Sequence, residues 1–247
     1  MGGGVYRKCQ TLAIDYQQFA EKYLQFYYDI PQQHFNDPQK TRKDNMSLWK
    51  KTTNGLCSAC LNTQTLQHVV SSCNVHLEQG CFTWRHNSIL KTLAEYLSSI
   101  KKNSLIYADI EGFDNPSVIT GPDDRPDMVV LNNTKDKICV VELTVGFETN
   151  IAKNCKRKEI RYKDICNSLK QRFGNVKYFN LSMGAIGMID KECKDFYGFL
   201  DEDMELELQQ TNYLVKKLIG CCIRSLTYYL FCMKDKQWVT PKRLYWE

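Results

Sequence analysis

Two consecutive apolar runs rich in β-branched residues, each joined to one carboxylate, constrain the fold of this chain more than any other feature. The first run, residues 127–131, begins with Asp127 directly after a proline, and the second, residues 138–145, contains Glu142. Runs of this kind favour β-strands, and the short polar linker 132–136 has the spacing of a hairpin. We therefore expect two adjacent strands that bring Asp127 and Glu142 close together.

The segments around these runs predict further strands and helices. Apolar residues recur at helical spacing in 83–101 and in 149–173, whereas 105–109 and 175–183 are short runs typical of strands. Residues 190–247 predict two or three more helices. The order of elements indicates an α/β fold in which a central mixed sheet is flanked by helices.

The apolar stripe of segment 149–173 includes a basic residue, Lys158. The stripe consists of Ile151, Cys155, Lys158, Tyr162, Ile165 and Leu169. Because such a stripe faces the sheet, Lys158 is expected to point toward the carboxylates, with Arg161 as the reserve choice.

Two carboxylates on neighbouring strands can hold one or two Mg²⁺ ions, and the Leu143 carbonyl is a plausible third ligand. A lysine beside them can orient or deprotonate a water molecule, or neutralise a phosphate. The pattern is compatible with metal-dependent phosphodiester cleavage by three catalytic residues, Asp127, Glu142 and Lys158, but does not by itself favour it. The alternative interpretation is a structural cluster of ion pairs.

A second motif combines thiols and an imidazole. Its spacing is C-x2-C-x7-H-x4-C, formed by Cys57, Cys60, His68 and Cys73. Thiolate and neutral imidazole ligands at this spacing favour tetrahedral zinc over a hard cation. The alternative is a group of buried thiols without metal. We interpret the nearby His76 as a surface histidine and Cys81 as a core cysteine.

The 12 cysteines of the chain bear on its compartment. The N-terminus lacks the apolar segment of a signal peptide, and we find no apolar run long enough to cross a membrane. Disulfides persist mainly in oxidising compartments, so we expect free or metal-bound thiols and a nuclear or cytoplasmic protein. The net charge of +5 at pH 7 is compatible with a nucleic-acid partner without requiring one.

We expect the 247 residues to form one principal domain with a smaller accessory one. Aromatic residues at helical spacing predict a helix over 12–28. The expected segments are a helical N-terminal extension or linker (1–47), a small zinc knuckle (48–82), an α/β core (83–183) and a helical C-terminal part of the same domain (184–247).

Five blocks within residues 48–183 together resemble the C-terminal part of reverse-transcriptase proteins from non-long-terminal-repeat retrotransposons that carry a restriction-like endonuclease. The blocks are the Cys/His motif, Arg85-His86-Asn87, Arg125-Pro126-Asp127, Glu142-Leu143-Thr144-Val145 and the pair Lys158 and Tyr162. Both the order and the spacing of the blocks match.

The resemblance implies a PD-(D/E)xK restriction-endonuclease-like core, structural Zn²⁺ in the knuckle, and catalytic Mg²⁺ on Asp127 and Glu142. The implied activity is nicking of target DNA, which primes reverse transcription. The expected partners are DNA and RNA of the element, with no membrane. We assign nucleic-acid contacts to Arg85, His86, Arg125, Arg161 and Tyr162. The alternative for His86, which begins an apolar stripe, is a core or capping histidine.

We find no polymerase motif, so we expect either a fragment of a longer reading frame or a standalone remnant. One alternative function is a catalytically vestigial, zinc-dependent fragment that only binds nucleic acid. Another is a structural or interaction protein in which zinc acts as a staple.

Overall fold

The structure, a computed structural model, describes residues 56–240 apart from positions 58, 64, 66, 102, 133, 135, 148–149, 186, 190–192 and 235–237. The helix predicted over 12–28 and the N-terminal extension 1–47 lie outside the described residues.

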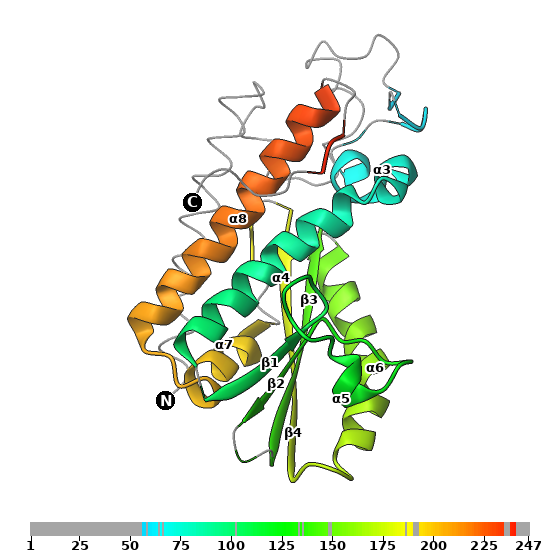
Figure 1. The fold of residues 1–247 in the computed structure, drawn as a ribbon. Coiled ribbons are helices and arrows are strands. Elements are labelled where there is room, and N and C mark those ends of the chain that lie inside the picture. The colour runs from blue at the N-terminus through cyan, green and yellow to red at the C-terminus, as the bar shows by residue number, and fades with distance from the viewer. Residues whose placement is uncertain are drawn as a thin grey trace.

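The centre of the fold is a four-stranded mixed sheet in the order β1-β2-β3-β4 (Figure 1). Its strands are β1 (Ser104–Ala108), β2 (Met128–Asn132), β3 (Lys137–Gly146) and β4 (Asn175–Gly184). The pairs β1–β2 and β2–β3 are antiparallel, whereas β3–β4 is parallel. A parallel pair needs a crossover, which helix α6 (Ile151–Leu169) provides. The strands and the mixed α/β class predicted from the sequence are confirmed.

Helices cover both faces of this sheet. Helix α6 lies on one face, and α4 (Cys81–Ile100) and α8 (Leu208–Lys234) lie side by side over the other (Figure 1). Side chains alternate between the two faces along a strand. Accordingly, Val140 packs with the buried residues of α6, whereas Val141 packs with those of α4 and α8. Burial on both faces explains why β2 and β3 are apolar throughout.

Short elements complete the described part. A π-helical turn, η2 (His68–Ser72), and α3 (Asn74–Glu78) lead into α4. Gly80, at φ 75°, makes the sharp turn between α3 and α4, a conformation that favours glycine. Helix α5 (Ser117–Thr120) lies between β1 and β2, and α7 (Lys194–Gly198) with η5 (Phe199–Asp203) precedes α8.

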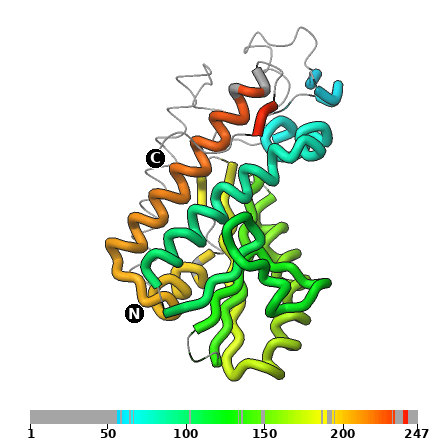
Figure 2. The backbone as a smooth tube through the Cα atoms, in the orientation of Figure 1, coloured from blue at the N-terminus to red at the C-terminus, as the bar shows by residue number. Residues whose placement is uncertain are grey.

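The backbone tube shows that the Cys/His segment lies beside the first turns of α4 and the C-terminal half of α8 (Figure 2). Segments far apart in the sequence therefore meet at one end of the molecule. None of the helices in the described part of the chain has the length and apolar character needed to cross a bilayer.

Candidate functional site

Asp127 and Glu142 hold each other at the edge of the β2–β3 pair. The register that pairs Met128 with Val141 makes Asp127 and Glu142 cross-strand neighbours. The Asp127 amide donates to Glu142 Oε1 at 2.8 Å, and the Leu143 amide donates to Asp127 Oδ2 at 2.8 Å. Each carboxylate is thus fixed by the backbone of the opposite strand, and the two acids lie close together as the two apolar runs predict.

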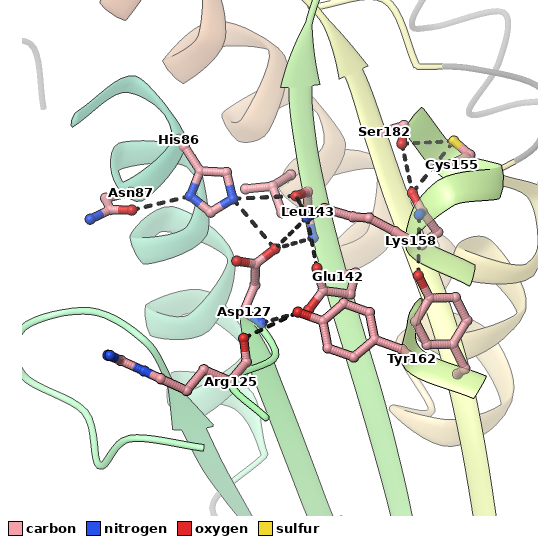
Figure 3. Close-up of polar contacts among 12 residues, drawn as sticks. His86, Asn87, Arg125, Asp127, Glu142, Leu143, Cys155, Lys158, Tyr162 and Ser182 are labelled. Carbon is pink, nitrogen blue, oxygen red and sulfur yellow. Dashed lines mark hydrogen bonds and ion pairs between the residues drawn. The ribbon is translucent and has the colours of Figure 1, made fainter. Parts of the chain in front are cut away.

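Lys158 of α6 reaches both carboxylates (Figure 3). Its Nζ lies 3.0 Å from Asp127 Oδ2 and 2.7 Å from Glu142 Oε2, and it also donates to the Leu143 carbonyl. The helical stripe predicted this direction for Lys158. The reserve candidate, Arg161, is exposed.

His86 joins the same cluster from the first turns of α4. Its Nε2 lies 3.4 Å from Asp127 Oδ2 and 3.3 Å from the Leu143 carbonyl oxygen, and its Nδ1 lies 3.1 Å from Asn87 Oδ1 (Figure 3). The sequence singled out His86 as a nucleic-acid contact and gave no sign that its ring meets Asp127. The strand and the helix are brought together only by the tertiary fold.

The electrostatics of the cluster separate its two acids. Burial and the charge of Asp127 raise the pKa of Glu142 to about 7, although Lys158 opposes this shift. Burial alone would raise the pKa of Asp127 as well, but hydrogen bonding and the charges of His86 and Lys158 hold it well below its usual range. Environment thus gives two neighbouring carboxylates different proton affinities.

The pKa values of the two bases, Lys158 and His86, are both raised. Burial disfavours the charged form of Lys158, yet the charges of Asp127 and Glu142 outweigh it and raise the lysine pKa. Burial also disfavours a charged His86, and its hydrogen bond and charge interaction with Asp127 raise the histidine pKa. In this cluster the two acids, Asp127 and Glu142, lie against the two bases, Lys158 and His86, whose positive charges offset the negative ones.

The donor set on the acid side consists of two carboxylates and one backbone carbonyl, from Asp127, Glu142 and Leu143. Oxygen ligands of this kind suit hard divalent cations such as Mg²⁺, which take few protein ligands and keep several waters. The residue types therefore fit such an ion.

A row of small polar side chains continues from Glu142 onto β4 (Figure 3). Asn180 pairs with Glu142 in the strand register, and Ser182 pairs with Thr144. Cys155 Sγ lies 2.8 Å from Ser182 Oγ, which donates to Asn180 Oδ1 at 2.6 Å. This row was not among the residues predicted from the sequence. The alternation of Asn180 and Ser182 along the predicted strand was the signal that could have found it.

The structure corrects two of the predicted nucleic-acid contacts. Arg85 is only 2% exposed, and its Nη2 donates to the Val70 carbonyl at 2.9 Å. Tyr162 is also buried, where its hydroxyl donates to the Arg125 carbonyl at 3.2 Å and its ring stacks on Tyr178. Neither side chain lies on the surface. Each instead donates a hydrogen bond to a backbone carbonyl of another segment.

Of the other three predicted contacts, His86 joins the cluster around Asp127 described above, and Arg125 and Arg161 are accessible. Arg125 Nη2 donates to Asp109 Oδ1 at 2.6 Å while more than half of its side chain is exposed. The guanidinium of Arg161 lies over the ring of Tyr162. Both remain candidates for contact with a phosphate backbone.

The predicted Cys/His motif forms a compact cluster of Cys57, Cys60, His68 and Cys73. All four ligand atoms lie within 4.8 Å of one another. Cys57 Sγ lies 4.0 Å from Cys73 Sγ, and Cys60 Sγ lies 3.1 Å from His68 Nε2. A tetrahedral zinc site places its ligand atoms roughly 3.5–3.8 Å apart, so the arrangement fits a metal such as zinc.

Buried contacts join this cluster to the rest of the fold. Tyr229 of α8 donates to the Val69 carbonyl, and its hydroxyl lies 2.7 Å from His76 Nδ1. His76 is therefore buried, which corrects its interpretation as a surface histidine, whereas Cys81 lies in the core as predicted.

Replacing Tyr229 by phenylalanine is expected to destabilise the protein by about 1–3 kcal/mol, because Val69 and His76 lose a buried partner. Urea unfolding measures this change. The control is Tyr213→Phe, since Tyr213 is exposed and its loss of a hydroxyl should change stability by less than about 0.5 kcal/mol. Equal effects of the two substitutions would contradict a docking role for Tyr229.

No protein-family model matches the chain, and no curated protein matches it.

Proposed function

We propose that this chain is a metal-dependent DNA endonuclease whose catalytic residues are Asp127, Glu142 and Lys158. The observation that carries the proposal is the contact of the Lys158 ammonium with both carboxylates. Each carboxylate accepts a hydrogen bond from a backbone amide of the opposite strand. Two acids and a lysine at one point of a mixed sheet are the components of a PD-(D/E)xK centre. The order of the five sequence blocks further supports descent from a retrotransposon endonuclease.

In this proposal the oxygens of Asp127, Glu142 and Leu143 would hold Mg²⁺. The bound ion would supply charge to the phosphate and lower the pKa of a water molecule. Glu142 and Asp127, each held by a backbone amide of the opposite strand, would fix the position of the ion. Lys158, which contacts both carboxylates, would neutralise a phosphate oxygen or orient the attacking water once the ion is bound. His86 holds Asp127 from the α4 side.

We also propose that the cluster of Cys57, Cys60, His68 and Cys73 holds a structural Zn²⁺ ion. The support is the closed set of four ligands, because catalytic zinc sites usually keep one position open for water or substrate. Thiolate ligands must stay reduced to bind metal, so a nuclear or cytoplasmic location suits the site.

A second candidate function is nucleic-acid binding without cleavage. It is favoured by the outward face of α6, which is basic and exposed through Lys153, Lys156, Arg157, Arg161 and Lys163. Such a face can bind phosphates without regard to sequence, and the affinity should fall steeply as salt rises.

Conversion of supercoiled plasmid to the relaxed form tests the two candidates. We expect nicking by the full chain that requires Mg²⁺ or Mn²⁺ and disappears in Asp127→Ala and Glu142→Ala. Nicking that survives both substitutions would sink the proposed endonuclease. Salt-sensitive binding of the plasmid, with no nicking in any divalent ion, would favour the second candidate.

A further inference from the structure

The Lys158 ammonium occupies a position enclosed by three oxygen atoms. These are Asp127 Oδ2 at 3.0 Å, Glu142 Oε2 at 2.7 Å and the Leu143 carbonyl oxygen (Figure 3). The same three groups are the ligands that the proposed function assigns to a divalent cation. A positive group of this chain therefore lies where the ion would bind.

The ammonium and a divalent ion cannot share this position. Oxygen–metal distances are about 2.0–2.6 Å for Mg²⁺ and Ca²⁺, so an ion held by these oxygens would stand in the space that Lys158 Nζ now fills. Two positive centres this close also repel each other, and the repulsion is strong where water is largely excluded. Entry of the ion requires the lysine to leave.

Burial explains why the metal-free protein needs a cation here. The Glu142 side chain is 1% exposed and that of Asp127 is 19% exposed. Leaving a buried and a partly buried carboxylate without a counter-charge costs several kcal/mol. His86 contacts Asp127 but has no described contact with Glu142, so Lys158 is the basic side chain that compensates Glu142 among the described residues.

We propose that Lys158 is a displaceable internal cation, which fills the divalent-metal position in the metal-free protein and leaves it when the metal binds. The proposal rests on the metal position assigned under the proposed function. It follows that Lys158 weakens metal binding while it stabilises the metal-free fold. It also follows that the ammonium becomes available to a phosphate only after the metal has entered, which sets the order of events at the site.

Isothermal titration of Mn²⁺ into the zinc-loaded full chain tests the proposal directly. We expect Lys158→Met to bind Mn²⁺ at least about tenfold more tightly than wild type, because the competing charge is gone. Lys170→Met is the matched control, since Lys170 is exposed at the end of the same helix, and its affinity should equal that of wild type. Asp127→Asn should bind Mn²⁺ far more weakly, which locates the site measured.

Thermal unfolding of Lys158 variants, with and without Mn²⁺, supplies a second readout. Without divalent ions, Lys158→Met should unfold at a lower temperature than wild type, and saturating Mn²⁺ should raise its midpoint by more than it raises that of wild type. Lys158→Gln removes the charge and retains a hydrogen-bond donor, so it serves where the methionine variant folds poorly.

Reductive methylation of wild-type protein needs no variant. Mass spectrometry should show slow modification of Lys158 in the absence of divalent ions and modification several-fold faster with Mg²⁺, while Lys170 reacts equally in both conditions. A rate at Lys158 that Mg²⁺ leaves unchanged would contradict displacement.

The outcomes separate this inference from the proposed endonuclease. Mn²⁺ affinity that is unchanged or weaker in both Lys158 variants, or absent from every variant, overturns the internal-cation role. If Mn²⁺ affinity is unchanged or weaker in both Lys158 variants and wild type still nicks plasmid, the internal-cation role fails and the endonuclease proposal stands. If the variants bind Mn²⁺ more tightly but wild type never nicks, the inference stands and the endonuclease proposal fails.

Discussion

Substitution of Cys73 by serine is expected to abolish binding of zinc and to lower the thermal unfolding midpoint more than any other single change discussed for this chain. Cys73 is buried between the end of η2 and α3, and its sulfur lies 4.0 Å from that of Cys57. Structural zinc contributes about 10–16 kcal/mol of binding free energy in zinc-finger peptides. The elements around the cluster, η2 and α3, are only five residues long each.

The measurements are zinc content by elemental analysis and the unfolding midpoint by circular dichroism. Cys166→Ser is the control, since Cys166 is a half-buried thiol on α6 outside the cluster, and it should keep one full equivalent of zinc. A chelator added to wild type should reproduce the effect of Cys73→Ser. A Cys73→Ser protein that retains zinc and melts with wild type would refute the zinc site.

Replacement of Asp127 by asparagine is expected to lower the rate of plasmid nicking about 1,000-fold while the protein stays folded. Asparagine keeps the shape of aspartate and an oxygen that can accept the Leu143 amide hydrogen bond. It removes the charge that a divalent ion needs, and losing such an electrostatic contribution costs orders of magnitude in rate.

Initial nicking rates at saturating Mg²⁺, together with the unfolding midpoint, measure this effect. Asp164→Asn is the matched control because Asp164 is exposed on the same helix as Lys158, and its rate should equal that of wild type. An Asp127→Asn protein that nicks within tenfold of wild type would remove Asp127 from the proposed mechanism. An unfolded variant would show itself in the melting curve.

The sequence predicted the sheet and the acid–lysine cluster well because both follow from local periodicity. The apolar runs determined β2 and β3, and the register of a hairpin then placed Asp127 opposite Glu142. The helical stripe placed Lys158 on the sheet side. That same stripe contains Tyr162, so the periodicity also predicts its burial, and the assignment of Tyr162 to nucleic acid was wrong.

The remaining errors arose from contacts between distant segments. His76 is buried by Tyr229, and Arg85 is buried by the docking of the Cys/His segment on α4. Local spacing states which residues share a face of a helix, but it does not state which other segment will cover that face. The contact of His86 with Asp127 eluded prediction for the same reason.

The adjacent residues Arg85 and His86 leave α4 in different directions, the first toward Val70 in the Cys/His segment and the second toward Asp127. Successive residues of an α-helix are rotated by about 100° around its axis. The helix therefore fixes the angle between the directions in which Arg85 and His86 point. One residue inserted between them would turn one attachment away from its partner, whereas a longer surface loop elsewhere would leave both intact. The first turns of α4 therefore tolerate no insertion or deletion between Arg85 and His86 without loss of one of the two contacts.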